Sequence, residues 1–326
     1  MTTKTLLATI GIIGSFATTT FSASTFIVES RSGGLNFANF SAPSGWATSS
    51  GNVNAPGCTL NIGSMYSGTG SFFGPSRYAQ FSYAPTTAGY YEVDLAWTLS
   101  AGEINTAVNL YTGAATGNTA ADIWGNTGGP MGIVYSTTMN MLNNGTSGTG
   151  TGTWMPVTTA QMSAGTTYKL GIYGGYKTPY TGGATAADAN ANRVIAGAAQ
   201  FIAATPLAAT YTGLDNDATD IGLSGTSLSW TAGSYDSLYN VWFGTSAGSL
   251  TEIGTGISVT SLSLDSQSLQ GGTEYFWRVD PVNVDVVTSG ALFDFTTVAA
   301  PEPSTAVLGL VGGLGLIGWT KLRRAA

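Results

Sequence analysis

The sequence predicts an all-β protein with two β-sandwich domains, flanked by an N-terminal signal helix and a C-terminal hydrophobic helix. The chain is 43% hydrophobic and 11% aromatic, whereas disordered chains lack the aromatic and β-branched residues that build a core. Only 8% of its residues are charged and 46 are glycine, a composition typical of strands joined by turns. Short runs that alternate apolar and polar residues are the third indication, because a period of two belongs to half-buried strands.

The first element is a signal peptide, predicted over residues 1–23. Lys4 is followed by an apolar run from Leu6 to Phe16 and then by small residues through Ser24, which is the order found in secretory signals. We expect cleavage near Ala23, so that the mature chain lies outside the cytoplasm.

The domain predicted over residues 24–204 opens with a strand at 26–29 and continues with strands at 90–97, 108–111 and 168–173. In the second of these, apolar and acidic side chains alternate, so one face is expected to point into the core and the other outward. The expected inward residues are Tyr91, Val93, Leu95 and Trp97, and the expected outward residues are Glu92 and Asp94.

Four segments of this domain resemble the golvesin-like family, a β-sandwich of the carbohydrate-binding-module type on bacterial secreted proteins. They are Gly45-Trp46 and the segments 88–93, 163–168 and 193–201. The last segment departs from the family pattern, because Gly197 and Gln200 stand where the family has Asp and Arg. The resemblance implies a domain that binds carbohydrate, without a transferable set of ligand residues.

Aromatic residues in or beside Gly-rich stretches are the candidate sugar contacts. Exposed rings with Asn and Thr neighbours suit stacking on sugars, whereas the alternative is that the rings fold back as lids over the core, where aromatics gain most from burial. Both interpretations stay open for Trp46, Tyr66, Trp124, Tyr176 and Tyr180.

Glu92 and Asp94 also define the alternative function, a carboxylate-dependent glycan hydrolase. Their Cα atoms lie roughly 7 Å apart by strand rise, near the separation used by inverting glycosidases. The strand alternation already explains both as a solvent-facing pair, and catalytic carboxylates normally come from different elements that flank a cleft. We therefore expect no catalytic residues.

The second domain is predicted over residues 205–298, where short alternating runs and turns follow one another at β-sandwich spacing. Core strands are expected at 228–230, 239–243, 276–279 and 291–297. The turn at 269–275 with Tyr275 resembles the tyrosine corner of fibronectin type III domains, in which the hydroxyl bonds back to the backbone. The resemblance extends along the whole segment and implies a spacer module. It implies no integrin-type adhesion, because the Arg-Gly-Asp tripeptide is absent.

Three carboxylates precede the first core strand of this domain. Asp215, Asp217 and Asp220 lie within six residues and offer oxygen ligands for Ca²⁺. The alternative, which we favour, is a solvated turn rich in Asp and Asn, because the rest of an EF-hand loop is missing. No other metal or cofactor is expected.

The final element, residues 299–326, is predicted to be a sorting tail with a hydrophobic helix. Pro301, Glu302 and Pro303 precede an apolar run of about 14 residues, which rises roughly 21 Å as a helix and falls short of the roughly 30 Å hydrocarbon core. The expected anchor comprises Ala306, Leu308, Leu310, Val311, Leu314, Leu316, Ile317, Trp319 and the basic residues Lys321, Arg323 and Arg324.

This three-part tail resembles the PEP-CTERM sorting domain of Gram-negative bacteria. The resemblance implies that an exosortase-like enzyme recognises the segment from Pro301 to Arg324, after a transient stay in the inner membrane. The basic end is expected to remain cytoplasmic by the positive-inside rule. The alternative is an ordinary tail anchor.

Composition also excludes several chemistries. The chain contains no histidine and one cysteine, Cys58, which removes His-based catalysis, His-ligated metals and an internal disulfide. The net charge of −7 opposes binding to nucleic acid. Cys58 itself is expected to be a small buried hydrophobe.

The sequence thus predicts an exported, non-enzymatic cell-surface or extracellular-matrix protein. Its first domain is expected to associate with extracellular polysaccharide and its second to act as a spacer. An inert surface-coat component is the remaining alternative.

Overall fold

The computed structural model describes residues 24–42, 46–67, 78–99, 106–112, 132–139, 146–147, 152–173 and 194–299. Within these ranges the chain is β-sheet, interrupted by two three-residue 3-10 helices, η1 (Phe37–Asn39) and η3 (Asp265–Gln267). The predicted all-β class is confirmed. No helix in the described ranges is long and apolar enough to cross a membrane. The predicted signal peptide and the tail from Pro301 lie outside the described residues.

Two antiparallel sheets form the first part of the chain. The four-stranded sheet has the order β1 (Thr25–Glu29), β14 (Ala198–Ala203), β6 (Gly89–Ala96) and β11 (Met155–Met162). The five-stranded sheet has the order β2 (Phe40–Ser41), β5 (Tyr78–Tyr83), β12 (Tyr168–Tyr173), β8 (Thr106–Thr112) and β9 (Gly132–Met139).

Smaller ladders cover one end of this part. A three-stranded sheet joins β13 (Ile195–Ala196), β4 (Ser64–Ser67) and β3 (Trp46–Ser49), and a parallel pair joins β7 (Thr98–Leu99) to β10 (Thr146–Ser147).

The main core of the first part lies between its two large sheets. Val93 and Phe201 face it from the four-stranded sheet, while Phe81, Leu110 and Leu170 face it from the five-stranded sheet, and all five are fully buried. The predicted inward face of β6 is confirmed, since its apolar residues are at most 2% exposed.

A second, smaller core covers the opposite face of the four-stranded sheet. Ile27 of β1, Ala96 of β6 and Ala198 of β14 pack there with Val53 and Ala55 from the loop between β3 and β4. This sheet is therefore buried on both faces over part of its length, and polar residues on its outer face lose contact with water.

The second part of the chain is a sandwich of a three-stranded and a six-stranded sheet. The first has the order β15 (Thr210–Thr212), β17 (Ser227–Thr231), β20 (Ser261–Ser263). The second has the order β16 (Ala218–Ile221), β23 (Phe293–Thr297), β21 (Glu274–Asn283), β18 (Leu238–Gly244), β19 (Thr251–Ile257), with β22 (Val286–Val287) paired to β21. Trp230, Val241, Trp277 and Phe295 fill the core between them.

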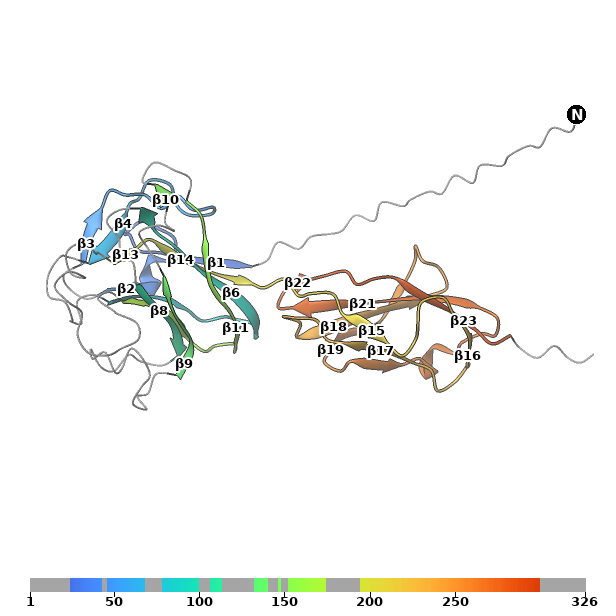
Figure 1. The fold of residues 1–326 in the computed structure, drawn as a ribbon. Helices are drawn as coiled ribbons and strands as arrows, with labels where there is room; N and C mark the ends of the chain where they lie inside the picture. Colours follow the sequence, from blue (N-terminus) through green and yellow to red (C-terminus); the bar gives the residue numbers. More distant parts are fainter. Residues whose placement is uncertain are drawn as a thin grey trace, which may run out of the picture.

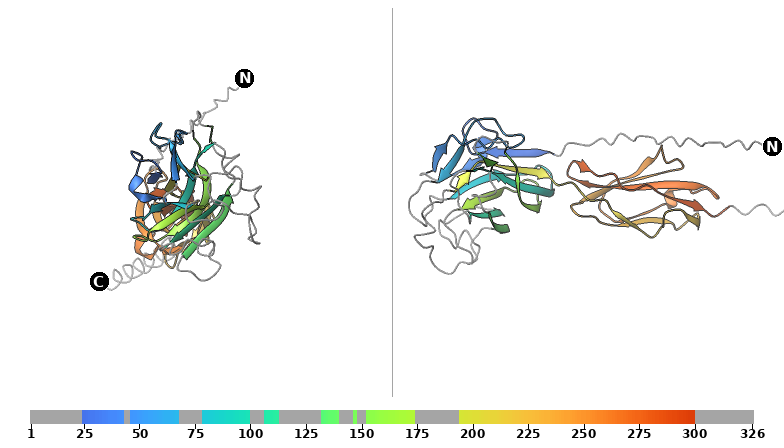
Figure 2. Two further views of the ribbon diagram at one scale, coloured as in Figure 1. Left: turned by 90° about the vertical axis from the view of Figure 1, so that its left-hand side faces the viewer. Right: turned by 45° about the horizontal axis from the view of Figure 1, so that its top comes forward.

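The two parts lie end to end, as the views in Figures 1 and 2 agree. The hairpin of β21 and β22 and the start of β1 both lie where the parts meet. The chain leaves the second part at the end that faces away from the first.

Among the described strands, the long ones at sheet edges are irregular. Of the outermost strands, β9, β11 and β19 have seven or eight residues, and each shows a register shift against its inner neighbour. The remaining outermost strands have at most five residues. Bulges and short length are two ways by which natural sheets discourage edge-to-edge pairing.

Candidate functional site

The two acidic residues of β6 differ in their surroundings. Glu92 is exposed, whereas Asp94 is only 8% exposed and accepts a hydrogen bond from Gln200 Nε2 at 2.6 Å. The expectation that both would face solvent is wrong for Asp94, because the second core and Gln200 cover that face of the sheet. Burial raises the pKa of Asp94, and burial with the nearby Asp94 charge raises the pKa of Glu92.

Two of the candidate sugar-contact rings fall within the described residues, and both lie on strands. Trp46 begins β3 and Tyr66 lies on β4, and each is half-buried against the main core of the first part. The Trp46 Nε1 atom is buried without a hydrogen-bond partner among the described residues. Trp124, Tyr176 and Tyr180 lie outside the described residues.

The Asp215–Asp220 segment forms a turn and the start of β16. Asp217 and Asp220 both have left-handed backbone, with φ of 60° and 59°, a conformation that Asp and Asn tolerate in turns. Asp217 lies beside Asp294, and burial together with the Asp217 charge raises the pKa of Asp294. Within the described residues, no group of three metal-ligating side chains is found.

The sequence did not single out Glu29, yet its buried carboxylate connects two loops of the first part. Glu29 is 3% exposed and accepts hydrogen bonds from Leu35 N at 2.6 Å, Thr59 N at 3.0 Å and Thr59 Oγ1 at 2.7 Å. A Cβ on Gly34 would lie 2.7 Å from the Glu29 Cβ atom. The loop therefore closes over Glu29 only because residue 34 has no side chain.

Cys58 lies beside this carboxylate and packs against the second core. Burial, followed by the Glu29 charge, raises the pKa of the thiol to about 12. Since the thiolate is the reactive form of cysteine, the raised pKa lowers the reactivity of this thiol at neutral pH. Cys58 is half-buried rather than buried as expected, although it packs against apolar residues as a small hydrophobe would.

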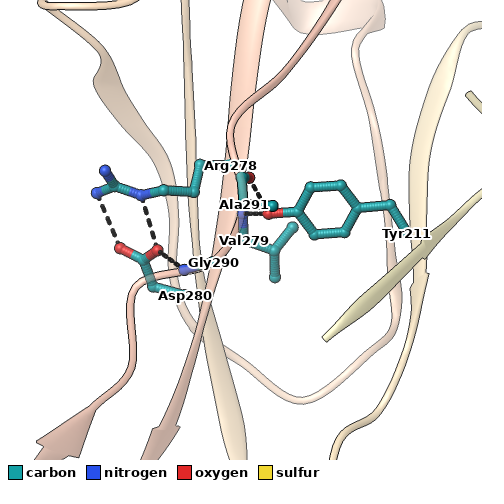
Figure 3. A network of polar contacts seen from close by, with 6 residues as sticks. All are labelled: Tyr211, Arg278, Val279, Asp280, Gly290 and Ala291. Atoms are coloured by element: carbon teal, nitrogen blue, oxygen red, sulfur yellow. Dashed lines mark hydrogen bonds and ion pairs between the residues drawn. The ribbon is translucent and has the colours of Figure 1, made fainter. Parts of the chain in front are cut away.

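Tyr211 is the centre of a polar network in the second part (Figure 3). Its hydroxyl accepts from Val279 N at 2.8 Å and donates to Ala291 O at 2.6 Å. A Cβ on Gly290 would lie 2.6 Å from this hydroxyl and 2.0 Å from Val279 O. The network therefore requires glycine at position 290 and fixes β15 and the segment that precedes β23 against β21.

Beside it, Arg278 and Asp280 form a two-point ion pair on the outer face of β21. The distances are 2.7 Å from Arg278 Nε to Asp280 Oδ1 and 2.9 Å from Nη2 to Oδ2. Gly290 N donates to Asp280 Oδ1 at 2.9 Å, and the guanidinium lies 5.5 Å from the centre of the Trp242 ring. Every one of these contacts is internal, so the network has a structural role.

The two parts meet at the turn between β21 and β22, here called the junction hairpin (residues 283–286). Asn283 is fully buried; its Nδ2 donates to Tyr90 O at 2.8 Å and Ala204 O at 2.7 Å, and its Oδ1 accepts from Tyr90 N at 2.8 Å. One side chain of the second part thus pairs with the start of β6 and with the segment that follows β14.

Apolar contacts complete the junction. Val286 is 6% exposed and belongs, together with the half-buried Val284, to the core of the first part. Val284 has a φ of 57°, which is strained for a β-branched residue. A Cβ on Gly89 would lie 2.5 Å from Val284 Cγ2. The hairpin can dock only because β6 begins with glycine.

Sequence reasoning placed 276–279 on a core strand but gave no role to Asn283 or Gly89. A Gly-Tyr pair at the start of a strand and an Asn in a tight hairpin are the signals that the sequence offered. Neither indicates a partner element, because periodicity reports which face is buried and not what covers it.

Comparison with known proteins gives only distant likenesses. No protein-family model matches the chain, and none of the curated proteins matches it. A Paenibacillus xanthan lyase is similar over 55% of this chain and 13% of its own length, with 15% identity and a TM-score of 0.35. The chain therefore spans about an eighth of that enzyme.

Two further structures are similar over part of the chain. A fibronectin type III-like protein of Clostridium thermocellum is similar over 30% of this chain and all of its own, with 24% identity and a TM-score of 0.24. The adhesin domain of Epf from Streptococcus pyogenes covers 73% of this chain and 77% of its own, with 11% identity and a TM-score of 0.33.

The fibronectin type III-like fold predicted for the second part is supported by its own geometry. Its two sheets share one core, and Gln270 N donates to the Tyr275 hydroxyl at 2.8 Å. This is the backbone bond that the tyrosine-corner resemblance implied.

Proposed function

We propose that this chain is an exported surface or matrix protein that holds its first part away from a C-terminal attachment point. In this proposal the two parts are two β-sandwich domains, and an exosortase-like enzyme processes the tail. The end-to-end arrangement with a buried junction supports it most directly, because the chain leaves the second part at the end opposite to the first.

The junction supports a fixed spacing rather than a hinge. Asn283 makes three hydrogen bonds across it and Val286 enters the core of the first part. Separating the parts would exchange these hydrogen bonds for bonds to water, at a net cost of about 0.5–1.5 kcal/mol for each bond, and would expose the buried side chain of Val286. The second part then acts as a spacer of constant length.

Association with extracellular polysaccharide is the binding role that we propose for the first part. The described rings Trp46 and Tyr66 pack against the core, so the proposal depends on Trp124, Tyr176 and Tyr180. The decisive experiment is a polysaccharide pull-down or glycan array with the mature chain. Retention on a matrix glycan that is lost on replacing these three residues by Ala supports the role, whereas no retention leaves an inert coat component.

Surface attachment has a separate test. Deleting residues 301–326 should release the protein into the medium, as measured by immunoblotting of cell and medium fractions. Unchanged retention on the cell would contradict the proposed sorting tail.

A glycan hydrolase is the second candidate, favoured by the raised pKa values of Glu92 and Asp94. We rank it lower because Asp94 is buried and already bonded to Gln200. Release of reducing sugar by the mature chain, abolished by Glu92→Gln, would establish it.

A further inference from the structure

The junction hairpin brings an acidic residue of the second part to Ser24, which precedes β1 in the first part. Ser24 Oγ donates a hydrogen bond to Asp285 Oδ2, although the two residues are 261 positions apart in sequence. Ala203 N donates to the Ser24 carbonyl at 3.3 Å, which fixes this residue at the start of the β1–β14 ladder. By covalent geometry the Ser24 α-nitrogen then lies within about 6 Å of the Asp285 carboxylate.

Asp285 has polar neighbours, but within the described residues no Lys or Arg forms an ion pair with it. The neighbouring titratable groups are Tyr83 and Tyr91, whose pKa values are raised by burial first and by the Asp285 charge in addition. A cation at the Ser24 nitrogen would be favoured there, because an opposite charge within about 4–6 Å stabilises the charged form.

We propose that cleavage of the signal peptide at the Ala23–Ser24 bond supplies that cation, and that the new α-ammonium group pairs with Asp285 across the junction. The inference rests on the proposed export of the chain. In the hydrolysis a water oxygen bonds to the Ala23 carbonyl carbon, the C–N bond breaks, and Ser24 leaves as an amine that takes up a proton. The Ala23 carboxylate departs with the leader.

The α-amine is basic, unlike the amide that it replaces. An α-amino group has a pKa of about 8 and is mostly protonated at neutral pH, whereas the Ser24 nitrogen of the precursor is an uncharged amide. The exported protein therefore gains an ion pair between its two parts that the precursor lacks. Processing thus tightens the contact between the parts.

The experiment uses the exported, processed protein. Mass spectrometry of its N-terminal peptide is expected to show Ser24 as the first residue. After isotope-labelled reductive methylation, NMR titration is expected to give the α-amine a pKa above 8 that falls on Asp285→Asn. Asp220→Asn, which removes an exposed carboxylate from the far end of the second part, is the matched control and should leave that pKa unchanged.

A double-mutant cycle tests whether the two groups act together. One variant carries an additional Gly before Ser24, which moves the ammonium by about 3.5 Å, and the other is Asp285→Asn. Each alone is expected to lower Tm by about 1–3 °C, in line with exposed ion pairs, and the combined variant no further.

The outcomes separate this inference from the proposed function. A protein that keeps its leader and stays in the cell overturns the proposed export and this inference together. A processed, exported protein whose first residue is not Ser24 overturns this inference but not the proposed function. The same holds if the pKa of the α-amine is unchanged by Asp285→Asn.

Discussion

Tyr168 in the first part and Tyr275 in the second close the same kind of turn. Ser163 N donates to the Tyr168 hydroxyl at 2.9 Å and Gln270 N donates to the Tyr275 hydroxyl at 2.8 Å, each five residues upstream. In both turns a Gly with positive φ lies three residues before the Tyr, with φ of 73° and 64°. The two parts of the chain thus share the same type of turn into a central strand.

The two parts differ in the residues that surround this turn. Tyr275 stacks with Phe243 and Phe295 at ring distances of 5.0 Å and 5.7 Å in an aromatic core. The first part buries the carboxyl groups of Glu29 and Asp94 outside its main core, and the donors that contact them are uncharged. The second part buries the carboxyl group of Asp280, which instead pairs with the guanidinium of Arg278. The comparison predicts that the first part depends more on single polar residues.

The largest expected effect comes from Glu29. Glu29→Ala should lower the free energy of unfolding of the first part by about 3 kcal/mol or more, because two backbone N–H groups and a hydroxyl lose a charged acceptor. Thermal unfolding followed by circular dichroism measures it. Glu92→Ala, at an exposed position of the same sheet, is the control and should change stability by less than about 0.5 kcal/mol. Equal effects would refute the dependence of the first part on its buried carboxyl groups.

The second-largest effect is expected from Asn283→Ala, which should lower the free energy of unfolding by about 2–3 kcal/mol. The reason is that Tyr90 N and the carbonyls of Tyr90 and Ala204 lose their hydrogen-bond partner. Small-angle scattering should also show a broader distribution of the end-to-end length of the two parts. Asn240→Ala, which removes only the acceptor for Gly256 N, should leave the distribution unchanged. A constant length in Asn283→Ala would show that apolar contacts alone fix the junction.

The tyrosine corners should have smaller and similar effects. Tyr168→Phe and Tyr275→Phe each remove one acceptor from a backbone N–H and should cost about 1–2 kcal/mol. The double variant should lose the sum, since distant sites without shared partners are additive. Chemical denaturation of the three variants checks both statements, and a much larger loss in either part would show that the corners are not equivalent.

Asp94 gives the smallest effect, and it depends on pH. Burial raises the folded-state pKa of Asp94 above 3.8, so ionisation at neutral pH opposes folding, and the contribution of this group is most favourable below the unfolded pKa. Asp94→Asn should therefore raise Tm at pH 7, and the gain should shrink as pH falls toward 3. Tm measured between pH 3 and 7 tests this, and a gain that persists at pH 3 would contradict it.

The sequence predicted the parts of the molecule that depend on local pattern. The alternation in 90–97 gave the buried face of β6, and the 269–275 turn gave the Tyr275 corner. The equivalent corner at Tyr168 was missed, although Gly-Thr-x-Tyr stands in both turns.

What depends on tertiary contacts could not be predicted in this way. Glu29 and Asp94 are buried because a loop and Gln200 cover the outer face of their sheet, and alternation alone assigns such positions to solvent. Asn283 and Tyr90 meet across 193 positions of sequence. A single chain without aligned relatives carries no signal for a contact of that range.

The irregular edge strands also affect how copies of this protein meet one another. In the proposed surface attachment, identical copies would lie side by side with their sheet edges at the same height. Flat edges in that position would pair between copies and promote fibrils. Because β9, β11 and β19 are each interrupted by a register shift, their edges are poor templates for such pairing, and copies held close together are expected to remain separate.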